Sequence, residues 1–212
     1  EVSSYFYRYI PRLYGLMDLF VPEALDRNFD PQPLIRSGIS FVQKEPLNLT
    51  GRNVVLGFAD TGIDYRNPVF RREDGSTRIL AIWDQSVQTG TPPDGLIYGS
   101  EYTREQINEA LQLDNPLELV PVTDDIGHGT AMASAAAGSA LNGGIDFLGA
   151  APDADIVVVK LKQAKQFLRD YYMTPPGVPA YGTNDIMLAV KYLSSFCIPF
   201  HRPAVICLGV GS

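Results

Sequence analysis

The sequence predicts an α/β fold built on a doubly wound, mostly parallel sheet, because apolar runs of strand length alternate with segments of helical character. Strands are expected over residues 53–59, 156–160 and 203–210, each a short apolar run close to turn-forming or charged residues. Helices are expected over 131–138, where the side chains are mostly small, and over 183–196, which has one apolar face. Open sheets of this kind place ligand chemistry at the carboxyl ends of their strands.

The first of these strands ends in a carboxylate. The run at 53–59 leads directly into an Asp-Thr-Gly motif, so Asp60 is expected at the carboxyl tip of a buried parallel strand. By itself, an aspartate before Thr-Gly is equally well explained as a turn or cap residue. Asp64, in the same segment, is interpreted as a turn or surface carboxylate.

A histidine precedes the small-residue helix. His128 stands in a Gly-His-Gly-Thr motif that leads into residues 131–138, and a helix with such small side chains can pack very close to a sheet. Taken alone, a histidine between glycines is equally typical of a solvated loop. The neighbouring Asp124 and Asp125 are interpreted as turn or surface carboxylates.

The remaining segments predict shorter elements. A helix is expected near 34–38 and a strand over 79–83. Residues 103–113 predict a helix that opens with a capping box. Residues 164–182 hold a Pro-Pro-Gly sequence and are expected to form a loop.

Three motifs in order indicate a family. Asp-Thr-Gly-Ile-Asp at 60–64, His-Gly-Thr at 128–130 and a strand ending in Leu208-Gly209 resemble the subtilisin-like serine proteases, or subtilases. The likeness extends over residues 34–212 and includes a Gly-Ala-Ala-Pro turn after the histidine helix. Within the family the chain is most similar to the spore-germination, Csp-type branch, on the segments 78–85, 102–108 and 160–165. This branch implies a secreted or spore-associated protein.

The resemblance implies a serine endopeptidase that hydrolyses peptide bonds with an Asp-His-Ser triad. A serine hydroxyl is a poor nucleophile near neutral pH, so it needs an imidazole to take its proton and a carboxylate to orient that imidazole. Asp60 is the expected orienting carboxylate and His128 the expected general base. They lie 68 residues apart, so only the fold can bring them together.

The nucleophile of this triad is expected beyond residue 212. In the family it lies in a Gly-Thr-Ser motif, and the asparagine of the oxyanion hole follows the Leu-Gly strand; neither is reached by Ser212. Residues 34–212 are therefore interpreted as the N-terminal part of a catalytic domain of the subtilisin type. Its sheet would be incomplete, and the fragment would be inactive without a C-terminal remainder of the catalytic domain as its partner. Residues 1–33 are interpreted as an N-terminal extension, either an ordered arm or a propeptide remnant.

The interval between Asp60 and His128 is longer than is typical of the family. This implies an insertion at about 71–119. A decorating subdomain at the surface is favoured over a substrate lid.

The resemblance also implies where substrate and metal would bind. A Ser-Leu-Gly backbone pairs with the peptide substrate in the family, and Cys207-Leu208-Gly209 occupies that place here, with cysteine in place of serine. The family calcium site would lose two oxygen ligands, because Gly143 and Val69 stand where they are expected. No calcium site and no other cofactor is therefore predicted.

Composition excludes several other classes of function. The formal charge is −7 and no basic patch is present, which argues against nucleic acid as a partner. No apolar run approaches the about 20 residues that span a bilayer. Cys197 and Cys207 are interpreted as two buried thiols, and two histidines without clustered cysteines indicate no zinc site.

Two functions stay open at this point. The first is a serine endopeptidase acting on a protein or peptide, favoured because folding alone does not require both Asp60 and His128. The alternative is a non-catalytic scaffold or regulator with the subtilase fold, because some members of the germination branch have lost triad residues. The codons after Ser212 discriminate between them.

Overall fold

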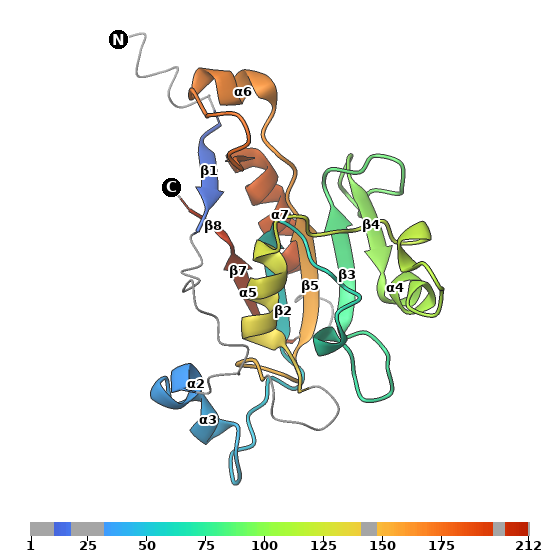
Figure 1. Cartoon of the computed structure of the whole chain (residues 1–212), viewed down its shortest axis with the longest axis vertical. Helices are drawn as coiled ribbons and strands as arrows, with labels where there is room; N and C mark the ends of the chain where they lie inside the picture. Colours follow the sequence, from blue (N-terminus) through green and yellow to red (C-terminus); the bar gives the residue numbers. More distant parts are fainter. Residues whose placement is uncertain (1–10, 18–31, 141–147, 197–201, 212) are drawn as a thin grey trace.

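The computed structural model describes residues 11–17, 32–140, 148–196 and 202–211 (Figure 1). Its centre is a five-stranded sheet in the order β4-β3-β5-β2-β7. Four of these strands run parallel, namely β3 (Ile79–Asp84), β5 (Asp155–Lys160), β2 (Val55–Asp60) and β7 (Ala204–Leu208). The edge strand β4 (Ser100–Thr103) pairs antiparallel with β3. The sheet is therefore mostly parallel, as the sequence predicts.

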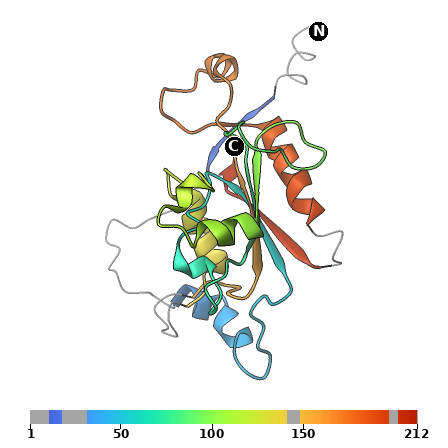
Figure 2. The same cartoon turned by 90° about the vertical axis from the view of Figure 1, so that its right-hand side faces the viewer.

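Helices cover both faces of this sheet (Figure 2). Helices α5 (His128–Ala137) and α4 (Arg104–Ala110) pack on one face, and α7 (Thr183–Ser195) packs on the other. Because side chains alternate along a strand, β2 serves both layers, with Leu56 and Phe58 towards α5 and Val55 and Ala59 towards α7. Burial on both faces explains the uninterrupted apolar run and confirms the doubly wound α/β fold.

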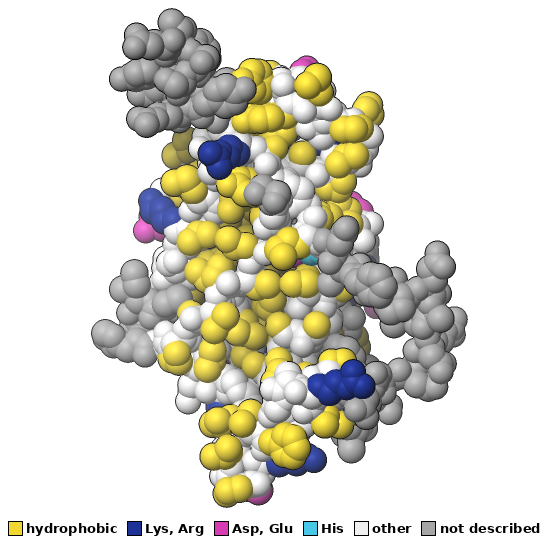
Figure 3. Space-filling view, turned by 90° about the vertical axis from the view of Figure 1, so that its left-hand side faces the viewer, with side chains coloured by type: hydrophobic (Ala, Val, Ile, Leu, Met, Phe, Trp, Pro, Cys, Tyr) yellow, Lys and Arg dark blue, Asp and Glu magenta, His cyan; other side chains and the backbone are white. Residues whose placement is uncertain are grey.

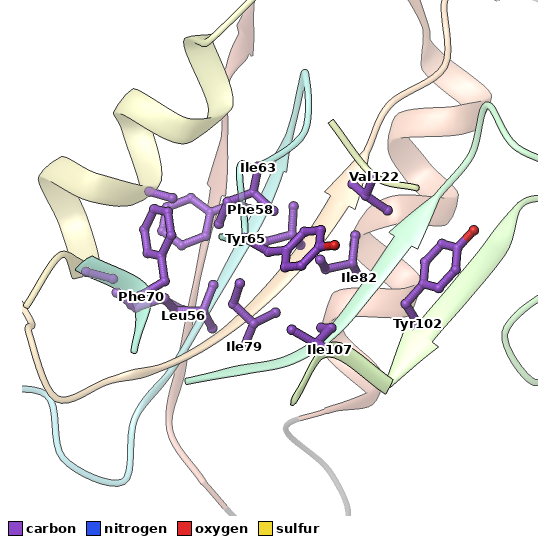
Figure 4. Packing of buried hydrophobic residues seen from close by; sticks show 14 of the residues in the cluster. Leu56, Phe58, Ile63, Tyr65, Phe70, Ile79, Ile82, Tyr102, Ile107 and Val122 are labelled. Atoms are coloured by element: carbon purple, nitrogen blue, oxygen red, sulfur yellow. The ribbon is translucent and has the colours of Figure 1, made fainter. Parts of the chain in front are cut away.

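The core on the α5 side brings together the centre of the sheet and the loop that follows β2. Figure 4 shows Phe58 of β2 near Ile63 and Phe70 from that loop, and Ile79 and Ile82 of β3 on the same face. Of these five side chains, Ile63, Phe70, Ile79 and Ile82 are fully buried, and Phe58 is 2% exposed. The end of β2 and its following loop are thus held by a continuous apolar layer.

Helix α5 lies unusually close to the end of β2, and one glycine allows this. A Cβ placed on Gly129 would lie well inside contact distance of the carbonyl oxygen of Gly62, and 3.1 Å from the Cβ of Asp60. The residue after the histidine must therefore lack a side chain. The small residues of α5 permit close packing, as the sequence predicts.

The other elements of this part of the fold are short. They are α2 (Gln32–Arg36), α3 (Ile39–Val42), η1 (Pro68–Phe70), η2 (Pro116–Glu118) and α6 (Gln166–Tyr171). Helix α6 forms inside the segment that the sequence predicts to be a loop. Helix α4 has the expected capping box between Thr103 and Gln106 but ends at Ala110, before the predicted end at 113.

A second sheet joins distant parts of the chain. Its central strand is β1 (Leu13–Leu16), which pairs antiparallel with β6 (Tyr181–Gly182) on one side and with β8 (Val210–Gly211) on the other. The strand expected over 203–210 therefore divides at Gly209 into β7 and β8. Figure 1 shows β1 lying beside β8, far from its neighbours in sequence.

The segment 71–119 does not form a separate surface subdomain. Strand β3 lies inside the sheet between β4 and β5, and its Trp83 is fully buried. The loop before β4 is tied to α7, since the hydroxyl of Tyr98 donates to Asp185 at 2.8 Å. The expectation of a decorating subdomain is wrong, because β3, with five of its six residues buried, is part of the core. An insertion relative to the family stays a prediction.

Candidate active site

Asp60 lies at the carboxyl end of β2 and is 1% exposed. Its Oδ1 accepts hydrogen bonds from the backbone N–H of Thr61 at 2.6 Å and from Nδ1 of His128 at 2.7 Å. Its Oδ2 is buried without a hydrogen-bond partner among the described residues. Burial raises the pKa of Asp60, and the hydrogen bonds from Thr61 and His128 offset this only in part.

His128 is the first residue of α5, and the preceding Gly127 has a left-handed φ of 82°. The imidazole is 7% exposed, with Nδ1 on Asp60 and Nε2 2.6 Å from the backbone oxygen of Met17. Burial lowers the pKa of His128, but the hydrogen bonds to Asp60 and Met17 outweigh it, so the pKa lies above its usual value. The structure therefore brings together the two residues predicted to be catalytic.

The N-terminal strand reaches this pair along a groove between β6 and β8. The N–H of Met17 donates to the oxygen of Gly209 at 3.1 Å, which continues the pairing of β1 with β8. On the other side, the N–H and hydroxyl of Thr183 both donate to the oxygen of Arg12 at 3.0 Å. An extended peptide with its backbone paired on both sides thus ends with a carbonyl at the imidazole.

The three residues predicted to bind substrate have different pairing partners. Cys207 and Leu208 pair with β2, opposite Phe58 and Ala59. Of the three predicted residues, Gly209 is the one whose backbone pairs with the extended segment, while its N–H still donates to Ala59 at 3.1 Å. Val210 and Gly211, which were not predicted as site residues, complete the groove wall as β8.

An apolar pocket of about 430 Å³ opens beside this groove. It is lined by Tyr14 of β1, by Ile186, Met187 and Val190 of α7, and by Leu208 and Val210. Its position next to β1 suits the apolar or aromatic side chain of a bound strand.

Asp124 was missed as a site residue. It was predicted to be a turn or surface carboxylate, but it is half-buried and accepts four hydrogen bonds from the segments that carry Asp60 and His128. Burial raises the pKa of Asp124, but bonds from Thr61 and Thr130 outweigh it and hold the pKa below its usual value. Asp125 is exposed, as expected. The signal available in the sequence was the pair of hydroxyl residues, Thr61 directly after Asp60 and Thr130 two residues after His128.

Some of the residues in the metal and thiol predictions lie outside the described part of the chain. The described residues contain no cluster of three or more His, Cys, Asp or Glu side chains suited to a metal ion. Gly143 and Cys197 lie outside the described residues, whereas Val69 is buried in η1. Cys207 is a half-buried free thiol whose pKa is raised by burial and by Asp60. Within the described ranges, no helix has the length and apolar character to cross a membrane.

Comparison with known proteins decides the family. The sequence model of the subtilase family matches residues 51–175, which include both Asp60 and His128. The chain belongs to the subtilase family. The structure is also similar to that of the Clostridium perfringens CspB protease, with a TM-score of 0.68 and 29% sequence identity over 84% of this chain. The Csp-type resemblance seen in the sequence is therefore confirmed.

The structural match covers only part of the CspB protease. The aligned region is 33% of the CspB protease chain, so this chain spans about a third of that protein. Among curated proteins no sequence matches the chain.

Proposed function

We propose that this chain supplies the orienting carboxylate and the general base of a serine endopeptidase. The observation that carries this proposal is the double contact of His128. One imidazole nitrogen is 2.7 Å from the buried Asp60 carboxylate and the other is 2.6 Å from a backbone carbonyl of an extended strand. A triad requires the first of these contacts, and it requires that Nε2 face the place where the serine hydroxyl attacks a peptide bond.

The nucleophilic serine would come from a C-terminal remainder beyond residue 212. Strand β7 is the edge of the five-stranded sheet in the described chain, and its Val205 and Leu208 are 59% and 38% exposed. Figure 3 views the molecule from the side of β1 and shows hydrophobic side chains spread over much of that face. An apolar edge strand of this kind favours further chain packing against it.

In the complete site, His128 would move one proton twice. Nε2 takes the serine proton as the oxygen attacks the peptide carbonyl carbon, and it then gives that proton to the leaving amine. Water, activated by the same nitrogen, hydrolyses the acyl-enzyme. Asp60 holds Nδ1–H throughout and stabilises the imidazolium.

The substrate would be a protein or peptide bound as a strand between β6 and β8. Residues 13–17 occupy this groove in the present structure, so they compete with an added substrate. Likeness to the CspB protease supports a role in spore germination and a secreted or spore-associated location.

An active-site phosphonate tests the proposal in the complete protein. Labelling of one serine is expected in the wild type and should be lost in His128→Ala and strongly reduced in Asp60→Asn. Asp125→Asn is the matched control, because it makes the same chemical change at an exposed carboxylate. Undiminished labelling in His128→Ala contradicts the assigned base. A folded wild type without labelling would favour the non-catalytic scaffold or regulator.

A further inference from the structure

We propose that Asp124 is a positioning residue that fixes His128 relative to Asp60. Its carboxylate links the loop after β2 to the first turn of α5, using both oxygens. The catalytic consequence rests on the proposed function, but the positional one does not.

The first oxygen joins the neighbours of the catalytic candidates. Asp124 Oδ1 accepts from the hydroxyl of Thr61 at 2.7 Å and from the N–H of Gly127 at 3.0 Å. Thr61 directly follows Asp60, and Gly127 directly precedes His128. The Thr61 hydroxyl oxygen also accepts the N–H of Gly129 at 2.9 Å. Both residues that flank the imidazole are therefore connected to the residue beside the carboxylate.

The second oxygen holds the next residue of the helix. Asp124 Oδ2 accepts from the N–H of Thr130 at 2.8 Å and from its hydroxyl at 2.7 Å. The Thr130 hydroxyl oxygen in turn accepts the N–H of Asp64 at 2.9 Å. A second connection thus runs from α5 to the loop after β2, on the other side of the histidine.

Only a carboxylate satisfies this set of donors. All four groups that meet Asp124 donate, and an ionised carboxylate only accepts. An asparagine would direct its NH₂ group at one pair of donors and leave one backbone N–H, that of Gly127 or that of Thr130, unpaired. The position also suits a negative charge, because it lies at the N-terminus of the ten-residue helix α5.

The network acts on the base through the backbone. Asp124 has no hydrogen bond to the imidazole among the described residues, whereas Asp60 contacts Nδ1 directly. Asp60 and Asp124 are the charged groups that act electrostatically on His128. Removing Asp124 therefore changes both the placement of α5 and one negative charge, and a test must separate these effects.

The test compares Asp124→Asn with Asp125→Asn in the complete protein. Both remove one carboxylate, but Asp125 is exposed and, within the described ranges, its side chain makes no hydrogen bond. Asp124→Asn is expected to lower kcat about 10²-fold, the effect of misplacing a catalytic group by about 1 Å, with little change in KM. Asp125→Asn should leave kcat unchanged. An equal loss in both variants would show a charge effect and overturn the proposal.

A spectroscopic readout decides the point without turnover. The proton on Nδ1 of His128, bonded to Asp60, should give a downfield resonance that is shifted or lost in Asp124→Asn and kept in Asp125→Asn. A wild-type resonance in Asp124→Asn overturns the proposal even if the protein proves to be no protease. If Asp124→Asn does not fold, Thr130→Val and Thr130→Ser replace it. The resonance should change in the valine variant, which loses the hydroxyl bonds, and stay near wild type in the serine variant; no difference between them overturns the proposal.

Discussion

Gly129→Ala separates close packing from helix propensity at the site. Propensity alone predicts that alanine stabilises the interior of a helix by roughly 0.5–1 kcal/mol over glycine. The structure predicts the opposite sign, because the new Cβ meets the carbonyl oxygen of Gly62 and lies 3.1 Å from the Cβ of Asp60. Backbone atoms form part of this obstacle, so no change of rotamer relieves it.

The size of the effect follows from the displacement that is needed. Overpacking of this kind costs about 1–3 kcal/mol, so up to about 2.5 kcal/mol of destabilisation remains after the propensity gain. For a chain of this size each kcal/mol of destabilisation lowers the Tm by roughly 2–4 °C. Because His128 precedes Gly129, a shift of α5 by about 1 Å would also break the 2.7 Å contact with Asp60 and cost about 10²-fold in rate.

Thermal unfolding of the wild type, Gly129→Ala and Gly57→Ala measures this prediction. Gly57 is the matched control, since its Cβ would meet side-chain atoms of Leu193, the nearest at 3.1 Å, and no backbone atom is among its nearest contacts. Gly57→Ala should therefore lose less stability. A Tm of Gly129→Ala at or above that of the wild type, or an equal loss in both variants, would refute the packing argument.

Three further predictions concern the same region. Gly209→Ala should disrupt the contact between Asp60 and His128, because its Cβ would meet the Asp60 carboxylate. An unchanged titration of His128 by NMR would contradict this. Gly211→Ala is the control, because its Cβ would meet only the flexible Met17 side chain, at 3.2 Å. Stability should fall as pH rises above 6.5, because the folded-state pKa of His128 is raised and its stabilisation is lost as pH passes through that pKa. The folded-state pKa of Asp60 is also raised, so this carboxyl adds a further loss of stability as the pH rises above 3.8. Urea unfolding at a series of pH values should show a smaller decline above 6.5 in His128→Gln than in the wild type. Calcium should not change the Tm, since Gly143 and Val69 replace two expected oxygen ligands, and a calcium-dependent rise would show that the site is kept.

The catalytic candidates were predictable because each stands at the end of a regular element. Asp60 follows an apolar run, and the near absence of polar residues in this run predicts burial on both faces of the strand. His128 precedes a run of small residues. Their chemistry depends on two local motifs and on the parallel order of the strands, which local patterns determine well. The contact between them was predicted from the resemblance to the subtilases, because neither motif alone indicates it.

The groove and its supports were not predictable in the same way. Strand β1 has four residues, and its partners lie at 181–182 and 210–211, so no local pattern indicates the pairing. The register at Gly209 depends on the Asp60 carboxylate beneath it, where a side chain would not fit. Asp124 looked like a surface residue because its contact with the hydroxyl of Thr61, 63 residues away in sequence, is formed only in the folded chain.

The groove occupant and the base constrain each other chemically. A carbonyl oxygen only accepts hydrogen bonds, and so does an ionised carboxylate. With Asp60 ionised, the contacts of His128 to Asp60 and Met17 are both hydrogen bonds only when both imidazole nitrogens carry protons. The docked strand β1 therefore favours the imidazolium, the form that cannot take a proton from serine. Release of Met17 frees Nε2 and removes one cause of the raised pKa of His128, so opening the groove and producing a competent base are the same event.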